Sequence, residues 1–370
     1  MTDPTRDLLP EGLEDRLPQS AAAATRVERA ALAAMDSYGY DRVRPPLIEF
    51  ETSMATRMDG VATRRMFRFV DPKSLRTLAL RADMTVQVGR IAATGLAARQ
   101  RPLRLCYGGM VARITGDQLD PRREGLQLGA ELIGSDTVAA AAEIVELAIA
   151  SLEAMGARGI SVDFTLPDLV DTLAETEFTL DAGQIDAVRR ELDAKDAGAL
   201  KDAGGEAFLP LLYAAGPFDE AVATLAGFDS SGVLASRIDG LKRIAARVKG
   251  RARLTLDPSE RHGFEYQTWF GFTIYAEGVR GSMGRGGTYR IGGSEEPATG
   301  FSLYPEELVE AVKAEEPTRA AVFLPLGHDP DAAERLRAEG WRTVAALSDS
   351  DDAGALGCSH VLRDGKAASL

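Results

Sequence analysis

The 370-residue sequence predicts an α+β protein built mainly on antiparallel strands, with an all-helical insertion and a short C-terminal α/β unit. Outside the insertion, apolar and polar residues alternate in segments separated by turn residues, which is typical of antiparallel strands. Between about residues 172 and 249 this alternation stops and the apolar spacing becomes helical. After a linker at 315–317, the pattern runs strand, helix, strand. We therefore expect a large domain over 1–314 and a small α/β domain over 318–370.

Each expected element has a local reason in the sequence. Residues 18–38 show helical apolar spacing that ends at Gly39. Pro45 and Pro46 then exclude a helix and favour an edge strand. The Asp71-Pro72 pair is typical of a hairpin turn. Further along, the sequence predicts a helix over 84–95, strands over 101–114 and 125–134, a helix over 136–155, strands over 251–258, 264–278 and 285–293, and a helix over 305–314.

The charge balance and hydropathy disfavour two classes of function. The 43 basic residues are outnumbered by 56 acidic ones, and a net charge of −13 opposes general attraction to nucleic-acid phosphates. The longest nearly uncharged runs, at 137–142 and 209–217, are too short to cross a bilayer. The N-terminus lacks a basic start followed by an apolar stretch, so we expect no signal peptide.

Generic motifs for metal binding and catalysis are missing from the sequence. Cys106 and Cys358 are the only cysteines, too few for a disulfide framework or a cysteine zinc site, and they fit a reducing cytoplasm. The three histidines, at 262, 328 and 360, have no ligand spacing. The glycine-rich stretch 281–293 lacks the phosphate-loop pattern, and no G-x-S-x-G is present. We expect no metal and no cofactor.

Residues 101–134 carry the most specific pattern: R-P-x-R-x-x-Y-x-G-x-x-x-R, a loop, then R-E-x-x-Q-x-G-x-E-x-I-G. This segment resembles motif 2 of class II aminoacyl-tRNA synthetases, in particular that of histidyl-tRNA synthetases. Further landmarks of that family follow in its own order at 8–18, 39–51, 78–85, 262–276 and 285–293. The resemblance covers roughly residues 8–312. It implies a class II synthetase-like antiparallel sheet flanked by helices, with the helical insertion where that family carries one.

Three departures from the synthetase motifs fall on residues that handle ATP or activate the amino acid. Thr115 stands where the family has the glutamate that reads adenine. Glu307 replaces the arginine that stacks on ATP, and a carboxylate there would repel the triphosphate. His262 replaces the arginine of the histidine motif, with Arg261 one position away, so a fixed positive charge is missing or weakened at pH 7. The resemblance therefore implies no catalytic residues.

The residues that would hold free histidine are better preserved. In the resemblance, Asp83 and Thr85 take the ammonium group, Arg113 takes the carboxylate, and tyrosines close the ring pocket. Gln127 and Glu131 lie on one face of a strand, and Glu131 could accept a hydrogen bond from the imidazole. A solvated strand face, core aromatics or a surface ion pair would be the structural alternatives. The full candidate set is Asp83, Thr85, Arg113, Gln127, Glu131, His262, Tyr266 and Tyr289.

The C-terminal segment separates the chain further from a synthetase. Residues 318–370 are much shorter than the anticodon-binding domain of that family, and the run Asp349, Asp351 and Asp352 is opposite in charge to what RNA favours. This combination resembles the regulatory subunits of ATP phosphoribosyltransferase, the first enzyme of histidine biosynthesis. It implies a homodimer within a hetero-octamer, with a short-form catalytic subunit as partner. In that assembly the chain would be required for activity, mediate feedback inhibition by histidine and bind no tRNA and no membrane.

One further expectation follows from the resemblance. The segment 39–50 corresponds to motif 1, which makes the subunit interface in class II synthetases, so we expect a dimer built on it.

Two alternatives of other classes stay open. One is a divergent histidyl-tRNA synthetase. The other is a stand-alone amino-acid sensor or an enzyme that aminoacylates something other than tRNA. Exchange of pyrophosphate into ATP with histidine separates the synthetase from the regulatory subunit.

Overall fold

The computed structural model describes residues 8–55, 66–116, 121–178, 180–261, 267–313 and 320–370. The chain divides into two compact units, Met1–Ala314 and Glu315–Leu370. In the described parts of the chain, no helix is long and apolar enough to cross a membrane.

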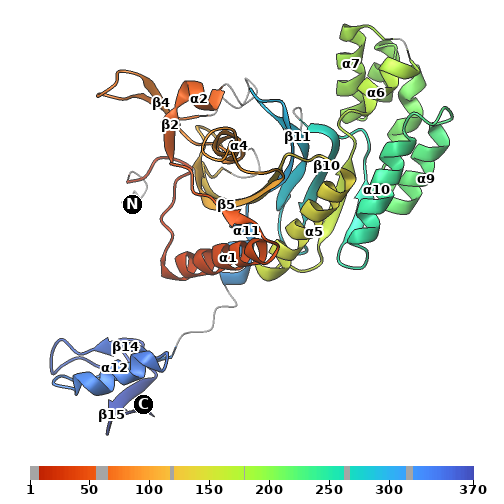
Figure 1. Ribbon diagram of the computed structural model, residues 1–370. Helices are drawn as coiled ribbons and strands as arrows, with labels where there is room; N and C mark the ends of the chain where they lie inside the picture. The colour runs from red at the N-terminus through yellow and green to blue at the C-terminus, as the bar shows by residue number, and fades with distance from the viewer. Residues whose placement is uncertain (1–7, 56–65, 117–120, 179, 262–266, 314–319) are drawn as a thin grey trace, which may run out of the picture. The chain divides into compact units, whose positions relative to one another are not determined.

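A nine-stranded sheet forms the centre of the first unit (Figure 1), in the order β1-β5-β6-β12-β11-β10-β7-β9-β8. From β5 to β7 in this order every neighbouring pair is antiparallel, while β1–β5 and β7–β9 are parallel. The strands are β1 (Asp41–Arg42), β5 (Leu103–Ala112), β6 (Glu124–Ile133), β7 (Ser161–Thr165), β8 (Gly216–Pro217), β9 (Arg253–Leu256), β10 (Gln267–Tyr275), β11 (Gly284–Ile291) and β12 (Glu296–Leu303).

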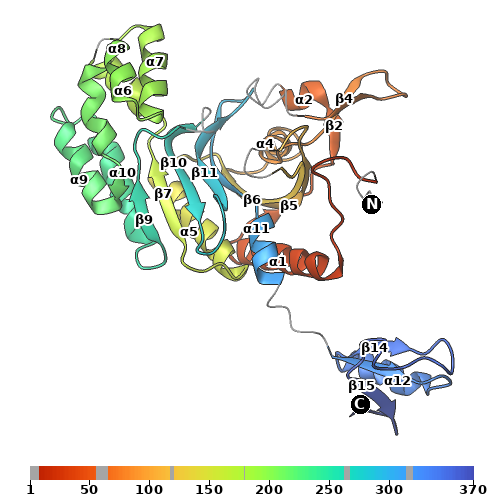
Figure 2. The same cartoon turned by 180° about the vertical axis from the view of Figure 1, so that it is seen from behind.

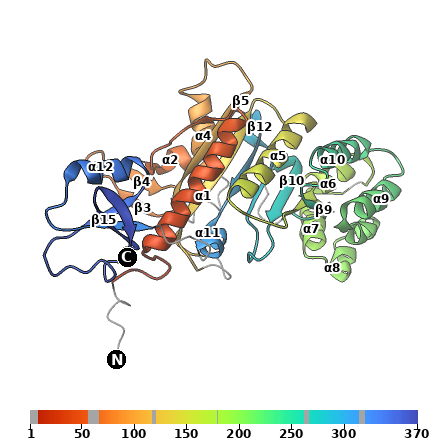
Figure 3. The same ribbon diagram turned by 90° about the horizontal axis from the view of Figure 1, so that it is seen from below.

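The two faces of this sheet differ because side chains alternate along each strand. The even-numbered residues of β6, from Leu126 to Leu132, pack into a large core with α1 (Pro18–Ser37) and α5 (Val138–Ala154). Figure 3 shows these two helices crossing the same side of the sheet. The odd-numbered residues face the other side, where α4 (Thr85–Ala93) packs with its own smaller apolar cluster. We call this second side the site face.

A small three-stranded sheet, ordered β2-β4-β3, precedes α4 in the chain. It is built from β2 (Ile48–Phe50), β3 (Arg68–Val70) and β4 (Thr77–Leu80), with α2 (Glu51–Ala55) following β2. The expected hairpin is confirmed, since β3 and β4 pair antiparallel and Asp71 accepts hydrogen bonds from the Lys73 and Ser74 amides in the turn. The strand that follows Pro45 and Pro46 is an edge strand, as predicted.

The helical insertion lies at the far end of the large sheet, beyond β10 (Figure 2). It shares the large apolar core of the sheet, where Phe218 packs on Phe164 of β7. Polar contacts add to this connection: Arg237 donates two hydrogen bonds to Asp168, and Lys195 Nζ lies 2.7 Å from Asp257 Oδ1. Trp269 of β10 packs near Gly240 and donates its indole N–H to the Asp136 carbonyl. The helices are α6 (Leu169–Thr176), α7 (Ala182–Asp193), α8 (Ala197–Asp202), the 3-10 helix η1 (Glu206–Tyr213), α9 (Phe218–Phe228) and α10 (Ala235–Arg247).

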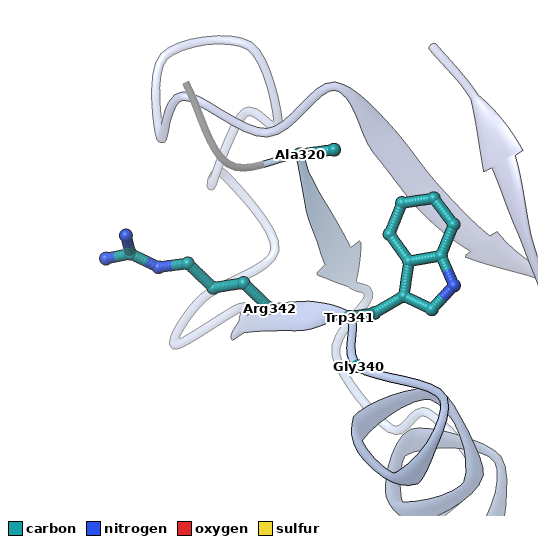
Figure 4. A pocket seen from close by; sticks show the side chains of 4 residues that line it. All are labelled: Ala320, Gly340, Trp341 and Arg342. Carbon is teal, nitrogen blue, oxygen red and sulfur yellow. The ribbon is translucent and has the colours of Figure 1, made fainter. Parts of the chain in front are cut away.

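The second unit is a four-stranded sheet, ordered β14-β13-β15-β16, with one helix. A pocket within this unit is lined by Ala320, Gly340, Trp341 and Arg342, and Figure 4 shows the Trp341 and Arg342 side chains pointing in opposite directions. Trp341 packs on His360, with ring centroids 4.8 Å apart. The elements are β13 (Ala321–Leu324), α12 (Pro330–Ala338), β14 (Arg342–Ala345), β15 (His360–Arg363) and β16 (Lys366–Ser369).

The α+β class is confirmed by the large antiparallel sheet and its flanking helices. Five strands were not anticipated: β7, β12 and the two-residue β8 in the large sheet, and the β15–β16 hairpin in the second unit. Because β8 lies within the expected all-helical insertion and pairs with β9, that insertion is not entirely helical. The last helix of the first unit, α11 (Glu306–Lys313), starts one residue later than expected. It packs against α1.

Candidate functional site

Glu131 lies at the centre of a buried polar network on the site face. Its side chain is only 1% exposed. The Tyr107 hydroxyl donates to Oε1 at 3.0 Å and the Tyr289 hydroxyl donates to Oε2 at 2.7 Å. Burial raises the pKa of Glu131 to about 8, against the opposite effect of the two tyrosine hydrogen bonds. The carboxyl group is therefore mainly protonated at neutral pH, and it can both donate and accept a hydrogen bond.

Gln127, four residues earlier on β6, connects the same strand to the start of α4. Its Oε1 accepts from the Met84 amide at 2.8 Å, and its Nε2 donates to Ser302 Oγ at 2.9 Å and to Asp83 Oδ1 at 3.2 Å. The Thr85 amide also donates to Asp83 Oδ1, at 2.7 Å. Gln127 and Asp83 thus satisfy the first amide groups of α4. Both hydrogen bonds that Asp83 accepts from described residues use Oδ1, and none uses Oδ2.

Tyr107 and Ser302 join the hydrogen bonds around Glu131 and those around Gln127 into one network. Tyr107 OH lies 3.1 Å from both Thr85 Oγ1 and Ser302 Oγ. Burial raises the pKa of Tyr107 well above its usual value, so its hydroxyl stays neutral. Neither residue was among the sequence candidates. The strand period pointed to Tyr107, which pairs with Gly129 midway between Gln127 and Glu131.

The network has room because glycines lie opposite its side chains. Gly300 of β12 pairs with Glu131, and a Cβ atom at Gly300 would overlap the Glu131 carboxylate. Gly129 pairs with Tyr107, and a Cβ atom there would overlap the tyrosine hydroxyl. Glycine on a strand interior is a packing weakness unless another group needs the space. On the site face these glycines accommodate the buried carboxyl and phenol groups.

The remaining candidates are not joined to Glu131 by described contacts. Arg113 lies over the Tyr304 ring, with its guanidinium carbon 5.2 Å from the ring centroid. Burial raises the pKa of Tyr304 to about 12, and the Asp83 charge adds to this rise while Arg113 opposes it. Arg113 is thus at the Asp83 end of the site. His262 and Tyr266 lie outside the described residues. Gln127 and Glu131 are both buried, which excludes a solvated strand face.

The residues at the expected ATP contacts have other partners or face solvent. Glu307 of α11 forms an ion pair with Arg122, which precedes β6. Thr115 is exposed after β5 and follows the half-buried Arg113. The clamp that would grip a triphosphate is therefore replaced by an internal pair of opposite charges. Among the described residues, no group of His, Cys, Asp or Glu side chains is arranged to hold a metal ion.

Comparison with known proteins identifies the family. Residues 12–308 match the family model described as histidyl-tRNA synthetase. A protein of Rhodospirillum centenum is 41% identical over 99% of this chain and 98% of its own length, and one of Paramagnetospirillum magneticum is 40% identical over 96% of each. Both are named ATP phosphoribosyltransferase regulatory subunit. The chain belongs to that family.

Solved structures share the fold of this regulatory-subunit family. A Bacillus halodurans protein, described as an ATP phosphoribosyltransferase regulatory subunit/histidyl-tRNA synthetase, superposes with a TM-score of 0.79 at 23% identity, covering 96% of this chain and 97% of that one. The histidyl-tRNA synthetase of Nostoc sp. PCC 7120 gives 0.77 at 17% identity, covering 95% and 90%. At these identities the likeness establishes the class II synthetase-like fold. The expected fold is thus confirmed.

Membership in the regulatory-subunit family puts the departures from synthetase motifs in context. The histidyl-tRNA synthetase family model matches up to residue 308 and so includes Glu307. The large sheet carries the buried hydrogen bonds from Tyr107 and Tyr289 to Glu131. At the positions that depart from the synthetase motifs, Thr115 is exposed and Glu307 pairs with Arg122. The chain therefore combines a synthetase-like framework with a buried polar network around Glu131.

Proposed function

We propose that this chain is the non-catalytic regulatory subunit of an ATP phosphoribosyltransferase, a glycosyltransferase of histidine biosynthesis. The supporting observation is identity of 41% along nearly the full length to a protein of that name. In this proposal the chain is required for activity of a short-form catalytic subunit and mediates inhibition by histidine. Both cysteines are free and buried, in keeping with work in a reducing cytoplasm.

Histidine is the proposed ligand, and the network around Glu131 is its proposed site. Asp83 Oδ2 would take the ammonium group, with Thr85 beside it. The buried Glu131, held by Tyr107 and Tyr289, would hydrogen-bond to the imidazole ring. Gln127 would fix the position of Asp83 relative to Glu131, because it bonds to the Met84 amide at the start of α4 and to Ser302 of β12. Arg113 is the carboxylate partner expected from the sequence.

Regulation requires that histidine bind two states of the assembly with different affinity. We propose a homodimer within a hetero-octamer as that assembly, with no tRNA among its partners. The motif 1 segment would form the dimer interface. Feedback inhibition then means that the inhibited arrangement of the complex binds histidine more tightly than the active one.

Copurification with the short catalytic subunit tests this proposal. The two chains are coexpressed with a tag on one, and ATP phosphoribosyltransferase activity is measured with and without this chain and across a histidine titration. We expect a stable complex, activity that depends on this chain, and inhibition by histidine that is absent with the catalytic subunit alone. A catalytic subunit that is fully active and equally inhibited without this chain contradicts the proposal.

A divergent histidyl-tRNA synthetase is the second candidate, since residues 12–308 match that family model. A synthetase must catalyse exchange of pyrophosphate into ATP in the presence of histidine. We expect no exchange and no magnesium-ATP binding by calorimetry, because Glu307 and its partner Arg122 stand where the ATP clamp would be. Tight magnesium-ATP binding would favour the synthetase.

A further inference from the structure

Arg81 is a buried cation that no described carboxylate neutralises. Its side chain is 7% exposed. Nε donates to the Met110 carbonyl at 2.7 Å and Nη1 to the Pro45 carbonyl at 3.0 Å. These are neutral acceptors, and among the described residues no acidic side chain forms an ion pair with it. Burial lowers the pKa of Arg81. A buried charge without a counter-charge is costly, which points to an anion that arrives from outside.

The remaining nitrogen of Arg81 lies on the site face. A Cβ atom at Gly109 would overlap Arg81 Nη2, so the guanidinium group occupies the space above this glycine. Gly109 is two residues from Tyr107 on β5 and therefore faces the same side of the sheet. It also pairs with Gln127 of β6. Nη2 makes no hydrogen bond to a described residue, although it lies beside the polar network.

Asp83 supplies the opposite charge without pairing with Arg81. The two residues are separated by one position, yet Asp83 uses its Oδ1 for Thr85 and Gln127. A cation and an anion are thus held near one another, each with one unused polar atom. A free α-amino acid carries the complementary charges, a carboxylate and an ammonium group on the same carbon. Such a ligand would satisfy both unused atoms at once.

We propose that Arg81 binds the carboxylate of the free amino acid whose ammonium group binds Asp83. The proposal rests on the proposed function and deepens it, because it assigns the carboxylate to a residue other than Arg113. Arg113 lies over Tyr304 instead. The fixed orientation of Arg81 supports this role: two backbone carbonyls hold Nε and Nη1, so Nη2 is positioned before the ligand arrives. The site therefore selects zwitterionic amino acids over amines.

The test compares two ligands that differ only in the carboxylate. L-histidine and L-histidinol are titrated into the full-length protein by calorimetry, using the parent, Arg81→Met and Arg104→Met. Arg104 is the matched control, since it lies on β5 with its guanidinium bound to Glu143 of α5. We expect the parent and Arg104→Met to prefer histidine, and Arg81→Met to bind histidine about 10- to 100-fold more weakly with histidinol affinity unchanged.

Three results would overturn the assignment. Equal loss of affinity for both ligands in Arg81→Met means that the residue is structural. Loss of the preference in Arg113→Met, with the preference kept in Arg81→Met, places the carboxylate on Arg113. If Arg81→Met does not fold, Arg81→Lys must lower the histidine-to-histidinol ratio below that of the parent, and an unchanged ratio refutes the proposal. A parent that binds neither ligand instead removes the proposed histidine site itself.

Discussion

Glu131 is buried with two hydroxyl partners and, within the described parts of the chain, no paired cation. The two tyrosines orient the carboxyl group, while burial raises its pKa to about 8. At neutral pH the part of the site around Glu131 is therefore mostly uncharged. A neutral carboxyl group can pair with either ring nitrogen of a neutral imidazole, as donor to one or acceptor from the other. Charge recognition is left to Asp83 and Arg81 at the opposite end.

Glu131→Ala should remove histidine sensitivity while leaving activation of the partner largely intact. With a mainly neutral Glu131, losing its hydrogen bond to the imidazole leaves a buried ring nitrogen unsatisfied and should cost about 1–3 kcal/mol, roughly five- to a hundredfold in affinity. A residue inside the pocket touches no second chain, so assembly should persist. The measurements are the histidine inhibition curve of the reconstituted complex and the melting temperature of the variant. Unchanged inhibition would show that Glu131 is not a ligand contact, and general destabilisation alone would indicate a structural role.

Glu131→Gln should become more stable than the parent as the pH rises. The folded pKa of about 8 lies above the ordinary value of 4.5, so the folded protein holds this proton more tightly than the unfolded chain. The resulting stability is fully present below the ordinary pKa and is lost as the pH rises through the folded one. Glutamine does not titrate, so the variant loses no stability in this way. Its melting temperature should therefore rise relative to that of the parent between about pH 4.5 and about pH 8.

Glu143→Gln is the control of opposite sign. The Arg104 hydrogen bonds hold the pKa of Glu143 below its usual range, so its stabilising contribution is present above the ordinary pKa and is lost on acidification. This variant should be less stable than the parent at neutral pH, and the difference between their melting temperatures should decrease as the pH falls. If both variants show the same trend, the elevated pKa of Glu131 is wrong.

Sequence periodicity could predict part of this chemistry. Two residues four apart on a strand face the same side, and Gln127 and Glu131 do meet one network through Tyr107 and Ser302. The strand period also pointed to Tyr107, but only the pairing of β5 with β6 places it opposite Gly129, and Ser302 lies on a strand that was not anticipated. No sequence pattern indicated Arg81 as a site residue either. Its role depends on two distant carbonyl groups, which only the fold brings close.

At the scale of elements, a glycine determines whether β6 and β12 can enclose Glu131. Gly300→Ala should destabilise the protein by about 1–3 kcal/mol and abolish histidine binding, because the new methyl group overlaps the carboxylate and lies close to the Ala130 carbonyl. Gly227→Ala is the matched control: it lies in α9 with open space around it, and should be stabilising by about 0.5–1 kcal/mol. Denaturant unfolding and histidine titration measure both. A fully stable Gly300→Ala that binds histidine normally would contradict the packing argument.

The same glycine explains why β12 escaped prediction. Its sequence, Glu296–Leu303, contains Pro297 and Gly300, which usually argue against a central strand. Pro297 is tolerated near the start of the strand, and Gly300 is required by the carboxylate across the sheet. β7 has five residues and gave a weak signal on its own. The long helices and the β3–β4 hairpin were predicted well because their signals are local, whereas the β15–β16 hairpin was missed although Asp364 and Gly365 form its turn.

At the scale of the whole molecule, the motif 1 segment should make the chain a dimer. Leu47 and Ile48 are 46% and 41% exposed at the β2 edge of the small sheet, and Phe69 and Val70 are exposed on β3 at its other edge. Exposed apolar residues grouped on one sheet favour an interface. Light scattering at micromolar concentration should give a dimer for the parent and a monomer for Ile48→Asp. Leu347→Asp, in the second unit, should stay dimeric, and a monomeric parent would refute the interface.

The chain contains two tryptophans, and the fold places one in each unit: Trp269 on β10 and Trp341 before β14. Trp269 packs beside Gly240 of α10, while Trp341 packs on His360. Replacing either one with phenylalanine leaves a single tryptophan, which can be excited selectively over the tyrosines. Emission from the first variant would then follow unfolding of the C-terminal unit alone, and emission from the second would follow the junction between the sheet and the insertion. The protein thus carries its own pair of optical probes for asking whether its two units melt together or in sequence.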